Sequence, residues 1–273
     1  MWSRKTLHVG FSAQRLILAE TDGMWPGKTS SCDSVHCAEE AGPESWRPAV
    51  AALARLLSER GEGKPALRIV LSGRFSRWQL LPWCTAVTRP DEQAAYAALH
   101  FRKTFGKATE RWQIVHAPQP PGMTAPACAI DTALLQALRD ICADAGTQLV
   151  AVTPYFASAF DHWRTVLKGG KDKMAWFGLI EPDGLSLGLL REGNWIGLRT
   201  HICYGEGDGW RDMLPGMMAQ ISIPAGFDEA AAPLYLAGSG EPPATVEDMP
   251  FTWLQPKVSA ECGKVGARMA LGI

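Results

Sequence analysis

The sequence predicts a mixed α/β protein built of two lobes, and three observations lead to this fold class. The chain has 273 residues, 47% of them hydrophobic, so it can bury a substantial core without disulfide bonds. Apolar runs typical of strands open the chain at residues 7–19 and recur at residues 175–198. A polar, Gly-rich stretch, Lys168–Lys173, separates these regions and is typical of a linker. The predicted lobes are therefore residues 1–170 and 171–273.

Charge and cysteine content narrow the function classes. The 27 Lys and Arg residues balance 28 Asp and Glu residues, which gives a net charge of −1 and no global attraction to nucleic acid or anionic membranes. The seven cysteines form no Cys-x-x-Cys pair, which favours free thiols in a reducing compartment. The sequence shows neither the apolar core of a signal peptide nor a run of 18 apolar residues. We therefore expect a cytoplasmic protein.

The first lobe opens with a predicted β-hairpin. Two short apolar strands within Leu7–Ala19 flank the polar turn Ser12–Arg15, and a third strand is weakly indicated at Ser34–Cys37. A helix follows, for which we expect Ser45 as the N-cap, Pro48 in the first turn and Gly61 at the end.

The rest of the first lobe alternates between strands and helices. Strands are predicted at 67–71, 78–82, 112–116, 126–130 and 149–152, and helices at 90–101 (closed near Gly106), 131–143 and 155–167. Pro90-Asp91-Glu92 opens the first of these helices, and Asp131 is the expected N-cap of the second.

The second lobe opens with a predicted three-stranded meander. Its strands are Ala175–Ile180, Leu185–Leu190 and Trp195–Leu198, joined by turns at Pro182-Asp183-Gly184 and Arg191–Asn194. Further elements are a helix at 209–220, strands at 234–237 and 251–254, and a final helix at 260–269.

This organisation resembles the actin-like ATPase superfamily, and more narrowly the PilM family of type IV pilus assembly proteins and the cytoplasmic domain of GspL. LHVGFSAQRLILAE resembles the first phosphate hairpin, AWFGLIEPDGLSLGLLREGNW the second, and LYLAGSG the adenosine-loop strand. The resemblance implies a two-lobed actin-like (ribonuclease H-like) fold with a small inserted subdomain at about 75–147. About 35 residues separate Leu198 from Leu234, where PilM has a full subdomain, so the second lobe is reduced.

The nucleotide site implied by this resemblance is degenerate. ATP-binding relatives carry Asp-x-Gly in both hairpins, where the Asp positions the metal and the Gly approaches phosphate. Here His8 stands at the first Asp position, and Leu179 at the second, with Glu181 in place of the following Gly. The degenerate nucleotide-site positions are His8, Gly10, Leu179, Glu181, Gly238 and Gly240. The resemblance thus implies no bound cofactor, no metal and no catalysis.

The resemblance also implies a function through protein contacts. We expect a non-catalytic scaffold of a type IV pilus or type II secretion inner-membrane assembly complex, peripheral to the bacterial inner membrane. Its partner would be a membrane-anchored pilus or secretion assembly protein, bound through a short cytoplasmic tail, or the secretion ATPase. Phe75, Arg77 and Trp83 are the expected contacts in a groove beside the inserted subdomain, because aromatic residues and Arg dominate binding hot spots.

Two other functions stay open from the sequence alone. The chain would be an active actin-like nucleotide-binding ATPase if Glu181 or Asp183 served as an atypical magnesium ligand. It would alternatively be an α/β protein with an unrelated small-molecule site. Trp78 and Trp112 fit either the core or the groove, since alternate strand positions face opposite sides.

Overall fold

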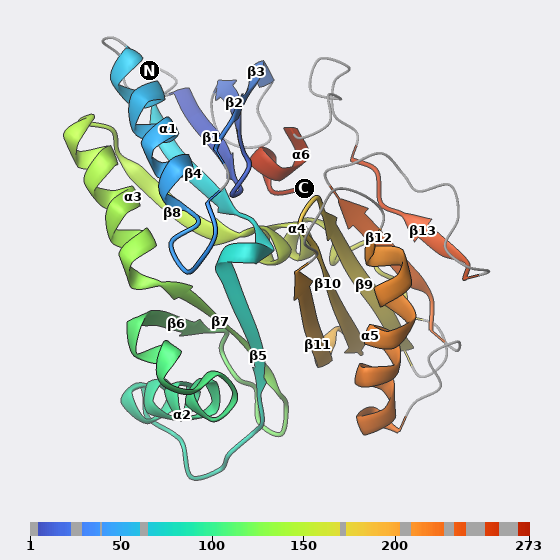
Figure 1. Cartoon of the computed structure of the whole chain (residues 1–273). Helices are drawn as coiled ribbons and strands as arrows, with labels where there is room; N and C mark the ends of the chain where they lie inside the picture. Colours follow the sequence, from blue (N-terminus) through green and yellow to red (C-terminus); the bar gives the residue numbers. More distant parts are fainter. Residues whose placement is uncertain are drawn as a thin grey trace.

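The computed structural model contains three β-sheets, in three separate parts of the molecule (Figure 1). It describes residues 5–22, 29–38, 40–60, 65–169, 173–202, 209–226, 232–238, 249–256 and 267–273. The mixed α/β architecture predicted from the sequence is confirmed. No helix within these ranges is long and apolar enough to span a membrane.

The first sheet has five strands in the order β3-β2-β1-β4-β8. The strands are β1 (Lys5–Phe11), β2 (Arg15–Asp22), β3 (Thr29–His36), β4 (Ala66–Leu71) and β8 (Leu149–Pro154). β1 pairs antiparallel with β2, as predicted, and parallel with β4. Its alternate residues Leu7, Val9 and Phe11 are fully buried on one face of the sheet, as expected for a strand with one face in a core.

Helices α1 (Arg47–Glu59) and α3 (Thr132–Asp144) cover that face of the first sheet. The predicted cap of α3 is confirmed, because the Asp131 carboxylate accepts a hydrogen bond from the Ala133 backbone N–H at 2.9 Å. The predicted cap of α1 is wrong. Trp46, not Ser45, is the N-cap residue and makes no side-chain capping bond, since an ordinary turn precedes the helix.

The second sheet has the order β11-β10-β9-β12-β13 and contains the predicted meander. Its strands are β9 (Met174–Glu181), β10 (Gly184–Arg191), β11 (Asn194–Ile202), β12 (Leu234–Gly238) and β13 (Phe251–Trp253). Helix α5 (Gly209–Ala225) packs on its outer face, where it covers Trp176, Leu185 and Leu187.

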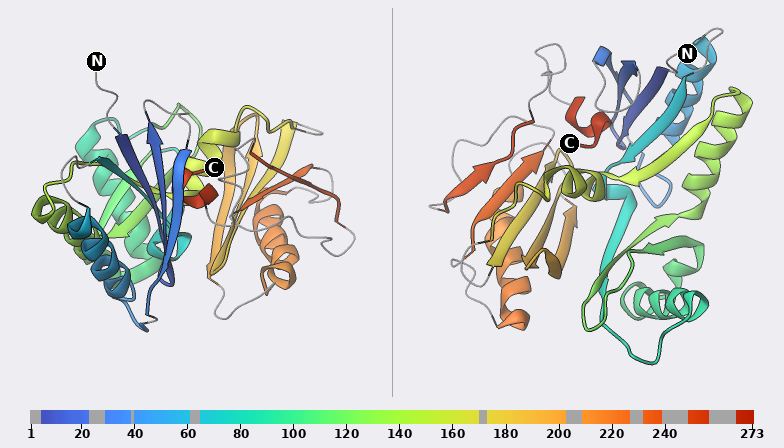
Figure 2. Two further views of the ribbon diagram at one scale, coloured as in Figure 1. Left: turned by 90° about the horizontal axis from the view of Figure 1, so that it is seen from above. Right: turned by 180° about the vertical axis from the view of Figure 1, so that it is seen from behind.

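Helices α4 (Tyr155–Trp163) and α6 (Ala267–Leu271) lie between the two five-stranded sheets (Figure 2). One apolar cluster joins residues of both sheets to these helices. Phe156 of α4 contacts Phe177 and Trp195, with ring centroids 5.6 and 5.5 Å apart. The order of layers is therefore α1 and α3, first sheet, α4 and α6, second sheet, α5.

A third sheet of three strands extends below the first lobe in Figure 1. Its order is β5 (Ser76–Leu81), β7 (Ala125–Asp131) and β6 (Trp112–His116), and α2 (Pro90–Phe105) packs on one face through Ala97 and Phe101. These elements fall within the range 75–147 expected for an inserted subdomain, whereas α3, in the same range, packs against α1 in the first lobe.

Several predicted bounds differ from the structure. α4 ends at Trp163 rather than 167, β3 is longer than predicted, and α5 continues to Ala225 despite Pro215 and Pro224 within it. α6 begins at Ala267 and packs on β1 and β2 of the first sheet, although it belongs to the range 171–273. Residues 170–172 of the predicted linker and 257–266 lie outside the described residues.

Gly188 gives a direct test of how tightly the second sheet packs. A Cβ atom at Gly188 would lie 2.1 Å from Cζ3 of Trp195, the residue that joins the sheet to α4. We expect Gly188→Ala to lower the free energy of unfolding by about 1–3 kcal/mol through overpacking, measured by denaturant titration. Gly216→Ala in α5, where a Cβ meets nothing within 4 Å, should be neutral or stabilising by up to about 1 kcal/mol. Equal effects at the two positions would contradict this packing.

Candidate functional site: a hairpin junction and an arginine-lined pocket

The two predicted phosphate hairpins meet at Ser72 and Gly73, the residues that follow β4. The Ser72 backbone N–H donates to the Phe11 carbonyl at the end of β1, with an N–O distance of 2.9 Å. The Ser72 hydroxyl donates to both carboxylate oxygens of Asp183, at 3.0 and 3.2 Å. The Gly73 N–H donates to both carboxylate oxygens of Glu181, at 3.1 and 2.9 Å. We call these five residues the hairpin junction.

The hairpin junction is tightly packed. Ser72, Glu181 and Asp183 are 1, 5 and 8% exposed, respectively. A Cβ atom at Gly73 would lie 2.6 Å from Oε2 of Glu181, so only glycine lets the carboxylate approach this closely. The side chains of the second lobe therefore take up the hydrogen-bond donors that the first lobe presents at this point.

The two carboxyl groups of the hairpin junction titrate at unusually high pH. Burial, with a further contribution from the charge of Asp183, raises the pKa of Glu181 to about 8. Burial also raises the pKa of Asp183, against the opposing effects of the Ser72 hydroxyl and the Arg74 charge. The pair therefore favours retaining a proton at neutral pH, because two buried like charges at close range repel each other.

The sequence-predicted Asp positions do not lie in this junction. His8 is in the middle of β1, where its Nε2 is 3.0 Å from Oγ1 of Thr21, and burial followed by the charge of Arg68 lowers its pKa to about 4. Leu179 is fully buried in the apolar cluster between the sheets. Glu181 and Asp183, at the end and in the turn of the second hairpin, are the residues that reach the first lobe. Glu181 was among the predicted site positions, and Asp183 lies in the predicted turn of this hairpin.

The glycines at the other predicted positions allow close backbone approach. A Cβ at Gly10 would lie 3.0 Å from the Ala270 backbone nitrogen of α6. A Cβ at Gly238 would lie 2.5 Å from the Ile180 carbonyl oxygen, and the Gly238 carbonyl accepts a hydrogen bond from Arg268 at 3.2 Å. Gly240 lies outside the described residues.

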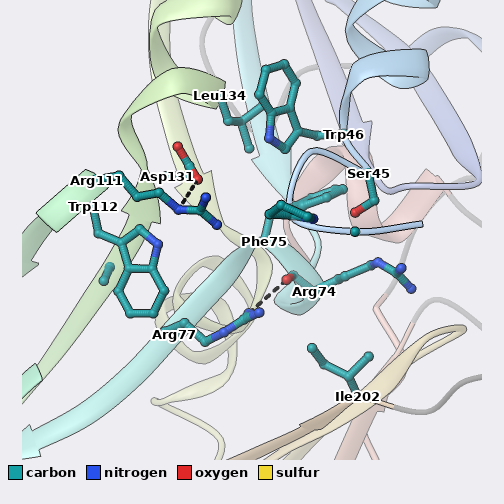
Figure 3. Close-up of a pocket in the computed structure, with 13 residues that line it drawn as sticks. Ser45, Trp46, Arg74, Phe75, Arg77, Arg111, Trp112, Asp131, Leu134 and Ile202 are labelled. Atoms are coloured by element: carbon teal, nitrogen blue, oxygen red, sulfur yellow. Dashed lines mark hydrogen bonds and ion pairs between the residues drawn. The ribbon is translucent and has the colours of Figure 1, made fainter. Parts of the chain in front are cut away.

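A pocket of about 140 Å³ lies beside the hairpin junction, where the first lobe meets the third sheet (Figure 3). The arginine pocket, as we call it, is lined chiefly by Trp46, Arg74, Phe75, Arg77, Arg111, Trp112 and Asp131. Arg111 forms an ion pair with Asp131 at 3.2 Å. Arg77 donates through Nη1 to the Arg74 and Ser76 carbonyls at 2.8 and 2.9 Å, which fixes its guanidinium group.

Two of the three predicted partner contacts meet in this pocket. Phe75 packs against Phe11 with ring centroids 5.7 Å apart, and Arg77 lies on the adjoining strand β5. Trp83 is half-buried beyond the opposite end of β5, so the structure does not bring it to Phe75 and Arg77. Trp112 lines the pocket, whereas Trp78 packs edge-on against Phe156. Arg111 was not predicted here, because no sequence spacing links it to Arg74 or Asp131.

The part of the chain that the structure describes contains no cluster of side chains suited to bind a metal ion. No three His, Cys, Asp or Glu side chains among these residues are grouped to hold a metal ion. At the hairpin junction the two carboxylates bind Ser72 and Gly73, and the basic side chain near Asp183 is Arg74.

Comparisons with known proteins identify the fold. The chain matches no family model, and no curated protein is similar to it in sequence. Among solved structures, it is similar to the cytoplasmic domain of EpsL, an inner-membrane component of the Vibrio cholerae type II secretion system. The identity is 10%, the match covers 98% of this chain and 92% of that one, and the TM-score is 0.61.

Two further structures share this fold. One is a Bacteroides thetaiotaomicron protein of unknown function with an actin-like ATPase fold, with 11% identity, coverage of 90 and 84% of the two chains, and a TM-score of 0.59. The other belongs to the PilM–PilN type IV pilus biogenesis complex, with 14% identity, coverage of 85 and 81%, and a TM-score of 0.54. The predicted fold class is therefore confirmed, and the chain has the actin-like fold.

Proposed function

We propose that this actin-like protein is a non-catalytic scaffold in a bacterial inner-membrane assembly platform of the type II secretion or type IV pilus kind. The fold shared with the EpsL cytoplasmic domain and with the PilM–PilN complex supports the setting. The hairpin junction carries the non-catalytic part of the proposal. There the protein's own carboxylates, and not an open cradle, accept from the Ser72 hydroxyl and the Gly73 backbone N–H between the lobes.

The chemistry of the hairpin junction disfavours a nucleotide. Phosphate is bound in proteins by backbone N–H groups and hydroxyls at close-approaching glycines. At Gly73 and Ser72 these donors already bind Glu181 and Asp183, both nearly fully buried. A phosphate would have to displace them and would face their negative charge at close range.

The arginine pocket supports the protein-binding part of the proposal. Phe75, Arg77 and Trp112 are aromatic or Arg residues that are half-buried around a concave surface, the composition typical of binding hot spots. The proposed occupant is a short cytoplasmic segment of a membrane-anchored assembly protein, or the secretion ATPase. This partner would hold the scaffold at the inner membrane.

Capture from the source organism tests this proposal. Tagged wild-type protein should recover an inner-membrane component of a pilus or secretion system from detergent-solubilised membranes. Arg77→Ala should weaken the purified complex by about 2 kcal/mol, or roughly 30-fold in Kd, while leaving the melting temperature close to that of the wild type. Recovery of metabolic enzymes alone, or undiminished binding by Arg77→Ala, would count against the scaffold or its pocket, respectively.

Trp83 needs a separate test because it lies apart from the arginine pocket. If the partner continues along β5, Trp83→Ala should also reduce capture without early melting. If the contact is confined to the pocket, Trp83→Ala should bind like the wild type. A large loss of stability in this variant would instead assign Trp83 to the core, where truncating a Trp costs about 3–5 kcal/mol.

A further inference from the structure

Building on the proposed function, we propose that the arginine pocket recognises an acidic side chain in an extended segment of the partner. A single carboxylate would lie between Arg77 and Arg111, and the apolar part of the segment would contact Phe75 and Trp112. The scaffold would thus select its partner by a Glu or Asp within an otherwise apolar stretch.

The charge of the pocket favours an anionic group. Its lining contains three Arg residues and one Asp, so positively charged side chains outnumber negatively charged ones there. The arginines come from three elements, the 3₁₀ helix η1 (Gly73–Phe75), strand β5 and the 3₁₀ helix η2 (Gly106–Arg111). Arg77 and Arg111 lie on the same side of Phe75, next to Trp112 (Figure 3). The Arg111–Asp131 ion pair shows that a carboxylate fits the guanidinium groups here.

A buried donor provides a second, independent observation. Trp46 lines the pocket and is only 7% exposed, yet its indole Nε1–H has no hydrogen-bond partner among the described residues. A buried donor left without an acceptor is costly. An acceptor that reached this wall of the pocket would satisfy the Trp46 donor, which no described residue does.

The pocket fits a carboxylate better than a phosphate or a nucleotide. Its volume of about 140 Å³ suits one acidic side chain and is too small for a nucleotide. Asp131 already lies in the lining, and Asp183 lies close to Arg74, so a dianion meets more repulsion than a single negative charge. The Arg77 guanidinium group is already fixed by its two hydrogen bonds to backbone carbonyls. It therefore loses less conformational entropy when it binds a planar carboxylate.

The experiment uses the full chain and three probes. The first is an acetylated, amidated Leu-Glu-Leu peptide, the second its Gln counterpart and the third inorganic phosphate. The readout is the ¹⁵N–¹H NMR signal of the Trp46 indole, assigned with Trp46→Phe, and of the Arg Nε–H groups. We expect the Glu peptide to shift the Trp46 and Arg111 signals at concentrations at least 10-fold lower than the Gln peptide, and less so at high salt.

Variants make the assignment specific. Arg77→Gln and Arg111→Gln should each weaken binding of the Glu peptide at least 5-fold. Arg102→Gln, which changes an exposed residue of α2, should have no effect on this binding. Asp131→Asn should tighten binding several-fold, because it removes the competing carboxylate while Asn still caps α3. Two independent Arg variants are used so that misfolding of one does not decide the result.

Each outcome has one meaning. Equal shifts by the Glu and Gln peptides, unchanged binding by Asp131→Asn, or tighter binding of phosphate than of the Glu peptide would overturn the inference. If the peptide fails but capture of an assembly component succeeds, the proposed function stands and this recognition is wrong. If the peptide binds as expected but capture recovers no such component, the pocket chemistry stands and the proposed function falls.

Discussion

Raising the pH from 6.5 to 8 should lower the free energy of unfolding of this protein by about 2 kcal/mol relative to that of Glu181→Gln. Burial holds the pKa of Glu181 at about 8, far above the value that the same carboxyl has in the unfolded chain. In this pH window the folded state keeps a proton that the unfolded state has lost, so stability falls by about 1.4 kcal/mol per pH unit for one proton. Relative to Glu181→Gln, the melting temperature should drop by about 4–8 °C over the window.

Other shifted groups also contribute in or near this pH window, and comparison with Glu181→Gln removes their effect. Burial lowers the pKa of His8, His100 and His162, so their contributions have the opposite sign and extend into the lower part of the window, where the unfolded imidazoles lose their protons. Burial raises the pKa of Cys128 to about 12 and of Cys142 to about 11, and their contributions begin above pH 8. The charged or titratable groups near Glu181 are Asp183, Arg74 and Tyr155.

Glu181→Gln supplies the control for this pH dependence. Its amide oxygen can accept the Gly73 hydrogen bond as the protonated carboxyl does, but the side chain does not titrate. This variant should not lose stability between pH 6.5 and 8, while Glu59→Gln, an exposed residue of α1, should keep the wild-type slope. An equal slope in the wild type and in Glu181→Gln would contradict the buried carboxyl pair.

Ser72→Ala should lower the free energy of unfolding by about 2–3 kcal/mol. The Ser72 hydroxyl donates to Asp183 and accepts from the Arg74 backbone N–H at 3.2 Å, and the residue is 1% exposed. Its removal leaves a buried carboxylate without this donor, and hydrogen bonds to charged groups contribute about 1.5–3 kcal/mol. Ser58→Ala, an exposed serine on α1, should change stability by less than about 0.5 kcal/mol.

A double-mutant cycle shows whether this loss belongs to the contact between the lobes. Urea unfolding of Ser72→Ala, Asp183→Ala and the double variant should give a coupling energy of about 1–3 kcal/mol. Additive effects within about 0.3 kcal/mol would mean that Ser72 and Asp183 act independently, and the hairpin junction would then not hold the lobes together.

The sequence predicted the framework of the fold because the first hairpin and the second-lobe meander carry clear local signals. Apolar runs separated by short polar turns identified both of them, and Asp131 identified the start of α3. The α1 cap was missed because a turn with ordinary helical geometry at Trp46 leaves no capping signature. α5 extends beyond its predicted end at residue 220, to Ala225, because its contacts with the second sheet compensate for the two prolines within it.

The candidate site was harder to predict because it is made by long-range contacts. Glu181 could be identified as a residue of the second hairpin, but its hydrogen bond to Gly73 crosses 108 positions of sequence. The register of a hairpin against a distant loop is set by packing, which the sequence does not reveal. His8 and Leu179 were therefore predicted to face the nucleotide site, whereas the structure buries His8 against Thr21 and Leu179 in the apolar cluster between the sheets. Arg74, Arg111 and Asp131 likewise meet only through the pairing of β5, β6 and β7.

We propose that the hairpin junction of this actin-like protein is filled by its own carboxylates and does not serve a nucleotide. Calorimetric titration of the wild-type chain with magnesium-ATP at pH 7 tests this most directly, with a melting-temperature measurement on the same samples. We expect no saturable heat and no rise in melting temperature at millimolar nucleotide. Saturable binding that Glu181→Gln or Asp183→Asn abolishes would contradict the claim and make Glu181 and Asp183 ligands of an active nucleotide site.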